Sequence, residues 1–201
     1  MDIFVATGNR HKLEEIDTMM RESQLDVNIY GAHAVGGMPE VDENGDTFAA
    51  NAELKARALL PLLQPGQWAL ADDSGIVVDA LDGQPGIHSA RYAGTHGADE
   101  ANNDKLLAEL GETPLEKRTG RFVCALALID SEGKSHIFEG KVEGHILFER
   151  HGDHGFGYDP LFRPVGYDTS FGVLPEEVKN EISHRSQALR KMREWLAKQK
   201  W

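Results

Sequence analysis

Two adjacent carboxylates lie near the middle of the chain, where Asp72 and Asp73 are followed by Ser74 and Gly75. Adjacent carboxylates repel each other and are costly to desolvate, so cations or hydrogen-bond donors must hold them. A divalent metal ion would serve. A plain Asp-Ser-Gly turn between two strands is the alternative. Because side chains alternate along an extended chain, we expect Asp72 and Asp73 to point to opposite sides, one toward a site and one bracing the backbone.

A polar turn near the N-terminus has the character of a phosphate-binding loop. It reads TGNRHK and lies between an apolar run at residues 3–6 and a helical pattern. Backbone N–H groups at the start of a helix bind phosphate well, and a lysine in the first turn adds a positive charge. A purely structural strand-to-helix turn is the alternative. The residues concerned are Thr7, Gly8, Asn9, Arg10, His11 and Lys12.

An acidic loop at residues 39–46 is too charged to belong to the core, and a solvated loop is its simplest interpretation. A helix is expected over residues 48–60, and it places Lys55 on the same face as Asn51.

A glycine-rich loop further along the chain holds an aromatic residue that is able to bind a flat ligand. Glycines on both sides of Phe156 let the backbone approach closely, and the ring can stack on a base. An aromatic packed under a glycine loop is the alternative. His151 and His154 are spaced as metal ligands can be, but no cysteine or third histidine supports zinc. The loop residues of interest are Phe156, Gly157, Tyr158 and Asp159.

Three basic residues, Lys179, His184 and Arg185, lie at the start of a C-terminal helical pattern. They are unusual in such an acidic chain and could recognise a phosphate or a carbonyl oxygen. The alternative is a solvated helix face.

Strand-like and helix-like segments carry these residues. The expected strands lie at residues 3–6, 26–30, 68–71, 76–78, 121–129 and 135–140, and the last two predict an antiparallel hairpin. The expected helices cover the pattern after residue 12, residues 48–60, residues 98–110 and a C-terminal stripe ending near Leu196. No internal repeat or low-complexity linker divides the chain, so we expect one compact unit.

Composition excludes some classes of function. The chain has 201 residues, a net charge of −12 and a pI near 5.1, which argues against nonspecific binding to nucleic acid or to an acidic membrane. The single cysteine, Cys124, lies in an apolar run and predicts a buried thiol in a reducing compartment. We see neither a signal peptide nor a membrane span, and we expect a cytoplasmic protein.

Six motifs taken together, in this order and spacing, resemble one family. They are TGNRHK at residues 7–12, TFAANAELKA at 47–56, ADDSG at 71–75, PGIHSARYAG at 85–94, FGYDP at 156–160 and ISHR at 182–185. The resemblance is to the inosine triphosphate pyrophosphatase family, also called the Ham1-like or non-canonical purine NTP pyrophosphatases. It runs from residue 3 to about residue 190.

The resemblance implies an α/β fold over a single domain, residues 1–201. Its sheet would be mixed and strongly twisted, flanked by helices, in an elongated two-lobed molecule with a central nucleotide cleft. It also implies a homodimer, with a purine nucleoside triphosphate as the ligand.

The reaction implied is the hydrolysis of ITP, dITP or XTP to the monophosphate and pyrophosphate, with Mg²⁺. Asp73 is similar to the catalytic base and metal-associated carboxylate of the family, and Ser74 to a substrate contact. In the acidic loop, Glu40, Asp42 or Glu43 would be the second metal carboxylate that the resemblance implies, and we choose Glu40. The segment from Thr7 to Lys12 resembles the phosphate-binding loop. The residues that resemble the nucleotide-binding residues are Phe156, Gly157, Tyr158, Asp159, Lys179, His184 and Arg185.

The chemistry of these residues suggests how substrate would be held and chosen. Lys12 and Lys55 would bind the triphosphate. Arg185 or His184 would donate to the oxygen at position 6 of hypoxanthine or xanthine and be left unpaired against adenine. A Maf-like nucleotide pyrophosphatase and a non-catalytic nucleotide sensor are the alternative functions.

Overall fold

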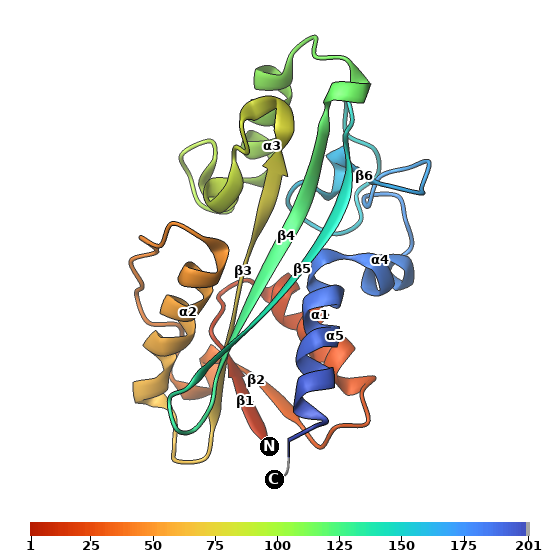
Figure 1. Ribbon diagram of the computed structural model, residues 1–201. Coiled ribbons are helices and arrows are strands. Elements are labelled where there is room, and N and C mark those ends of the chain that lie inside the picture. The colour runs from red at the N-terminus through yellow and green to blue at the C-terminus, as the bar shows by residue number, and fades with distance from the viewer. Residues whose placement is uncertain (200–201) are drawn as a thin grey trace. The chain divides into compact units, whose positions relative to one another are not determined.

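A computed structural model of the chain describes residues 1–199, and within them six strands form one mixed sheet in the order β2-β1-β3-β4-β5-β6 (Figure 1). The strands are β1 (Asp2–Val5), β2 (Asn28–Gly31), β3 (Trp68–Val78), β4 (Thr119–Ile129), β5 (Ser135–Ile146) and β6 (Phe162–Pro164). The flanking α-helices are α1 (Arg10–Arg21), α2 (Phe48–Leu59), α3 (Asp99–Leu110), α4 (Glu176–Ile182) and α5 (His184–Leu196). The α/β class with a mixed, helix-flanked sheet is therefore confirmed.

Pairing at the edges of the sheet follows from the connections. β1 pairs in parallel with both β2 and β3, with Val5 opposite Gly31 on one side and Leu70 on the other. Parallel neighbours need long crossovers, and α1 and α2 lie in these crossovers. β5 and β6 are antiparallel, and β4 and β5 are neighbours joined by a short turn, as the predicted hairpin requires.

The chain forms two compact units, each with its own apolar core. The first comprises residues 1–73, residues 124–140 and the C-terminal segment from residue 185, and the second comprises residues 74–123 and 141–184. The single domain expected from the sequence stays a prediction. None of the helices within residues 1–199 is long and apolar enough to cross a membrane.

In the first unit, alternation along the strands divides the core between two faces of the sheet. Leu70 of β3 belongs to a cluster that includes residues of α1 and α5, whereas its neighbours Ala69 and Ala71 belong to a cluster with α2. β1 follows the same rule, since Ile3 lies in the first cluster and Phe4 in the second. The sequence position of a residue on β3 therefore decides which helices it meets.

The second unit has an aromatic core. The ring centroids of Phe122 and Phe162 are 4.6 Å apart, and those of Phe162 and Phe171 are 5.6 Å apart. Leu106 and Leu110 of α3 belong to the same cluster, so α3 is anchored by apolar side chains on one face.

One prediction about the strands is wrong. We expected residues 72–75 to interrupt two short strands, but β3 runs without a break from Trp68 to Val78. The four polar or small residues between the two apolar runs suggested a break, but the two acids lie buried within the strand. Both are 7% exposed or less, and the cations that accompany them, described below, remove the need for a turn into solvent.

Candidate active site

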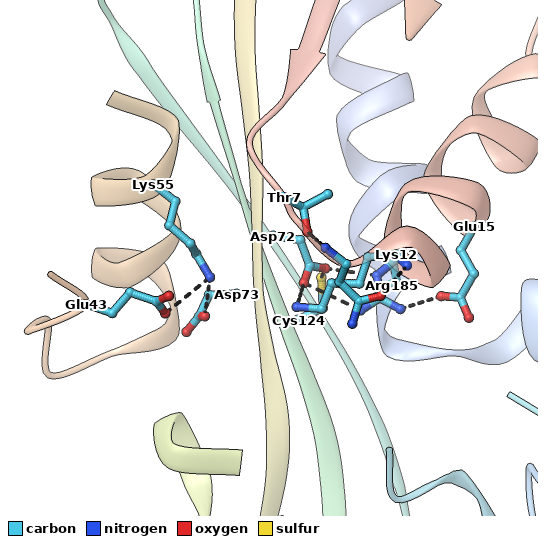
Figure 2. Close-up of polar contacts among 10 residues, drawn as sticks. Thr7, Lys12, Glu15, Glu43, Lys55, Asp72, Asp73, Cys124 and Arg185 are labelled. Atoms are coloured by element: carbon cyan, nitrogen blue, oxygen red, sulfur yellow. Dashed lines mark hydrogen bonds and ion pairs between the residues drawn. The ribbon is translucent and has the colours of Figure 1, made fainter. Parts of the chain in front are cut away.

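Strand β3 presents its two carboxylates to opposite faces of the sheet, as predicted (Figure 2). By the alternation described above, Asp72 continues the row of Leu70 toward α1 and α5, and Asp73 continues the row of Ala69 and Ala71 toward α2. Two adjacent residues therefore enter two different chemical environments.

Asp72 lies at the centre of a group that we call the Asp72 cluster. The Nζ of Lys12 donates to its Oδ1, and the Nε of Arg185 donates to its Oδ2 at 2.9 Å. The thiol of Cys124 also donates to Oδ2, at 3.1 Å, and Arg185 makes a second ion pair with Glu15. In these contacts two carboxylates thus face two cations.

We expected one of the two acids to brace the backbone. Asp72 has a broader role than such a local brace. Asp72 joins side chains from α1, β4 and α5, which lie far apart in the sequence. Burial would raise the pKa of Asp72, but the charges and hydrogen bonds of Arg185 and Lys12 outweigh it and hold the pKa well below its usual value. The carboxylate is therefore ionised at neutral pH.

On the other face, Asp73 belongs to a smaller group, the Asp73 group, with Lys55 and Glu43 (Figure 2). The Nζ of Lys55 donates to Asp73 Oδ1 at 2.6 Å and lies 3.4 Å from an oxygen of Glu43. One cation faces two carboxylates, so this group carries one negative charge in excess. The second oxygen of Asp73, Oδ2, is buried and has no hydrogen-bond partner among residues 1–199.

Burial acts on the pKa of Asp73 in the same direction as on that of Asp72, but the net shift is opposite. It raises the pKa, and the opposing charge and hydrogen bond of Lys55 do not cancel the rise. Burial would lower the pKa of Lys55, but Asp73 and Glu43 raise it above its usual value, so the lysine stays charged. A carboxylate with a raised pKa and an unused oxygen is suited to accept a proton.

The acidic loop reaches this group through Glu43. Asn51 of α2 fixes the end of the loop, because its Oδ1 accepts from the N–H of Gly45 at 2.8 Å, and the same oxygen lies 2.7 Å from where a side chain on Gly45 would begin. Glu40 is exposed, and Asp42 accepts from Asn44 within the loop. Glu40 as a metal ligand stays a prediction, but the geometry gives Glu43 the stronger position.

A metal ion at this place would need ligands from outside the protein. No group of three or more His, Cys, Asp or Glu side chains within residues 1–199 could hold an ion by itself. Two carboxylates and a net negative charge do fit Mg²⁺, which takes oxygen ligands and often binds one or two carboxylates together with substrate phosphates.

The N-terminal turn has the predicted form. Asn9 is the N-cap of α1, where its side chain accepts from the N–H of Lys12, and the hydroxyl of Thr7 accepts from the N–H of Asn9 at 3.1 Å. The side chain of Arg10 pairs with Glu14, and a side chain at Gly8 would meet nothing within 4 Å. The start of α1 is therefore an open helix N-terminus with Lys12 in its first turn.

The second unit holds the aromatic loop, residues 155–159, which we call the Phe156 loop. Asp159 is 3% exposed, and its Oδ2 accepts from the N–H of Phe156 at 2.9 Å and from the Nζ of Lys179 at 2.7 Å. That Nζ also lies 4.8 Å from the centre of the Phe156 ring. The hydroxyl of Tyr158 donates to the carbonyl oxygen of Ser89 at 2.8 Å. The loop is thus tightly held, and the ring of Phe156 is half-exposed.

The three basic residues near the C-terminus are buried, so the alternative of a solvated face is wrong. Lys179 and His184 are each 5% exposed and Arg185 is 1% exposed. The ring of His184 stacks on Phe122 with the ring centroids 4.9 Å apart. Ser74 is half-buried on β3.

Some members of the site could not be found from the sequence. Glu15 pairs with Arg185 across 170 positions, and Cys124 contacts Asp72 across 52. Cys124 was expected to be buried, and this is confirmed, but no local pattern indicates its partner.

A mixed α/β sheet, a capped helix N-terminus with a lysine and paired acids beside cations are together typical of enzymes that act on phosphorylated ligands. Comparison with known proteins then identifies one family within this broad class of enzymes. A model of the Ham1 family matches residues 3–195, and the chain belongs to that family.

Individual relatives match this chain over nearly its full length. A dITP/XTP pyrophosphatase of Opitutus terrae is 47% identical over 199 residues, covering 97% of this chain and 98% of that protein. One of Geobacter sulfurreducens is 45% identical over 194 residues, 96% of each chain. The solved Ham1 protein of Staphylococcus aureus has a TM-score of 0.86 at 36% identity and covers 100% of both chains, and a HAM1 protein of Coxiella burnetii has a TM-score of 0.87 at 34% identity, with 99% of this chain and 100% of that one covered.

Proposed function

We propose that this protein hydrolyses non-canonical purine nucleoside triphosphates, namely dITP, XTP and ITP, to the monophosphate and pyrophosphate. The observation that carries the proposal is the Asp73 group, in which a buried carboxylate with a raised pKa and a free oxygen lies beside Lys55 and Glu43. The names of the relatives, dITP/XTP pyrophosphatase, supply the substrate class.

The phosphates would bind where positive charge is already arranged. The N-terminus of α1 offers backbone N–H groups, and Lys12 adds an ammonium group. Lys12 is held by Asp72, so its position is set before the substrate arrives. Lys55 would add a second cation beside the reacting carboxylate.

Asp73 would act as the general base. In this step Asp73 Oδ2 takes a proton from a water molecule, the water oxygen forms a bond to the α-phosphorus, and the bond from that phosphorus to the bridging oxygen of the leaving pyrophosphate breaks. Lys55 donates to the other oxygen of the same carboxylate, Oδ1, so Oδ2 is the oxygen available to the water.

Asp73 and Glu43 would hold Mg²⁺ together with the substrate phosphates. When bound, the ion supplies charge neutralisation for the triphosphate and for the leaving group. The negative charge in excess on the Asp73 group supports this assignment, since a divalent cation would offset it.

Stacking of a base on Phe156 stays a prediction, supported within the second unit by a residue that is half-exposed and whose ring lies close to Lys179. Direct pairing of Arg185 with the oxygen at position 6 stays a prediction. Its guanidinium group contacts Asp72 and Glu15 and is buried, so a base would reach its remaining N–H donors only after neighbouring side chains move. The homodimer and the cytoplasmic location also remain predictions.

Product analysis tests this function. We expect pyrophosphate release from ITP, dITP and XTP in the presence of Mg²⁺, much slower release from ATP and GTP, and loss of activity when EDTA removes the metal ion. Orthophosphate as the product would contradict the assigned bond cleavage. Saturable binding of ITP without hydrolysis would indicate a nucleotide sensor, and preference for modified pyrimidines would favour the Maf-like alternative.

A further inference from the structure

We propose that Asp99 and Asn103 of α3 are positioning residues that fix the Phe156 loop and thereby set the affinity for the purine base. Asp99 Oδ2 accepts from the N–H of Gly157 at 2.7 Å, and Asn103 Nδ2 donates to the carbonyl oxygen of Gly157 at 2.9 Å. Both backbone groups of one loop residue are therefore held by one helix. The inference about base affinity rests on the proposed function.

The two side chains are placed for this task by their spacing. Residues four positions apart share one face of a helix, so Asp99 and Asn103 reach the same segment. Asp99 is the first residue of α3, and a negative charge is favourable at that end. The apolar side chains of Leu106 and Leu110 anchor α3 in the core of the unit, which makes the helix a firm support for the loop.

The stability of α3 alone does not explain why the side-chain amide of Asn103 is buried. It is 1% exposed, and its Oδ1 has no hydrogen-bond partner within residues 1–199. Burying an amide with an unused acceptor is costly. The contact that the amide does make is with Gly157, so holding the loop is the role the geometry gives it.

Gly157 is the point at which this support matters most. Its φ is +61°, a conformation that glycine adopts easily, and a side chain there would meet nothing within 4 Å. The space that a side chain at Gly157 would fill is therefore open, in the residue that follows Phe156. On its other side the loop is fixed by Asp159, so contacts from α3 complete the restraint that orients the ring.

Removing either side chain from α3 should loosen the ring without touching the reacting carboxylate. We expect Asn103→Ala and Asp99→Ala to raise KM for ITP about tenfold and to change kcat less than about twofold, which is the pattern of lost substrate binding. Asp99→Asn keeps an oxygen that can accept from Gly157, and we expect it to restore a near-normal KM.

The matched control is Asn102→Ala. Asn102 is the neighbouring residue of α3 and is 2% exposed, but its amide accepts from the N–H of Ala93 at 2.8 Å and so holds a different loop. We expect its KM to stay near that of the wild type. An equal rise in KM for Asn102→Ala, or an unchanged KM for both alanine variants of the proposed residues, would overturn the inference.

A second measurement separates this inference from the proposed function. Limited digestion with chymotrypsin, with mass spectrometry of cuts after Phe156, reports the restraint on the loop without any nucleotide. We expect faster cutting in Asp99→Ala and Asn103→Ala than in the wild type, Asp99→Asn or Asn102→Ala. If the wild type hydrolyses no nucleotide, the proposed function is refuted, but the digestion still tests whether α3 restrains the loop. Unchanged cutting in the alanine variants would refute that restraint. Asp99 is half-buried, so its alanine variant serves if Asn103→Ala does not fold.

Discussion

Replacing Asp73 with asparagine should lower kcat for ITP by about a hundredfold to ten-thousandfold, which is the usual contribution of a general base. An amide has the shape of the carboxyl group and can still accept from Lys55, but it cannot take a proton from water. Pyrophosphate release at saturating ITP measures the loss. Titration calorimetry should show that ITP still binds. A turnover close to that of the wild type would refute the assignment of Asp73.

The same substitution at Asp72 should change the free energy of unfolding. We expect Asp72→Asn to lower the free energy of unfolding by about 3 to 5 kcal/mol at pH 7, because Arg185 and Lys12 would lose a buried counter-charge. Urea denaturation followed by circular dichroism measures the change. Asp73→Asn is the matched control, and its free energy of unfolding should lie within about 1 kcal/mol of the wild type, since burial already disfavours the charged form of Asp73.

The difference in the free energy of unfolding between the wild type and Asp72→Asn should become smaller at acidic pH. The pKa of Asp72 in the folded state lies well below the usual value of 3.8, so its stabilising effect is fully present above 3.8 and is lost as the pH falls toward the folded pKa. The gap between the wild type and Asp72→Asn should therefore be constant from about pH 5 to 7 and shrink below 3.8. A gap that grew on acidification would contradict the ion pairing. Adding Lys12→Met to both proteins would measure how much of the gap comes from Lys12.

Much of the fold could be predicted because periodicity reports local structure. The helical stripe beginning at Leu13 and the capped helix over residues 48–60 appear as α1 and α2, and the hairpin appears as β4 and β5. Alternation also predicted that Asp72 and Asp73 would diverge. Each of these inferences needs information only from neighbouring residues.

The features that could not be predicted depend on contacts between distant segments. Arg185 meets Asp72 across 113 positions, and this contact is one reason why β3 can carry charge through a core without a break. Burial of Lys179 depends in the same way on Asp159. The acidic loop has no periodicity that could distinguish Glu43 from Glu40, and only the fold shows which one reaches Lys55.

The opposite orientation of Asp72 and Asp73 places a limit on how this gene can change in length. A one-residue insertion or deletion in β3 ahead of the pair would turn each acid to the other face, leaving Arg185 without its carboxylate and Lys55 beside the wrong one. The turn between β4 and β5 carries no such constraint. An insertion scan should therefore recover active variants around residues 131–133 and none in residues 68–72, a pattern of length tolerance set by the parity of a single strand.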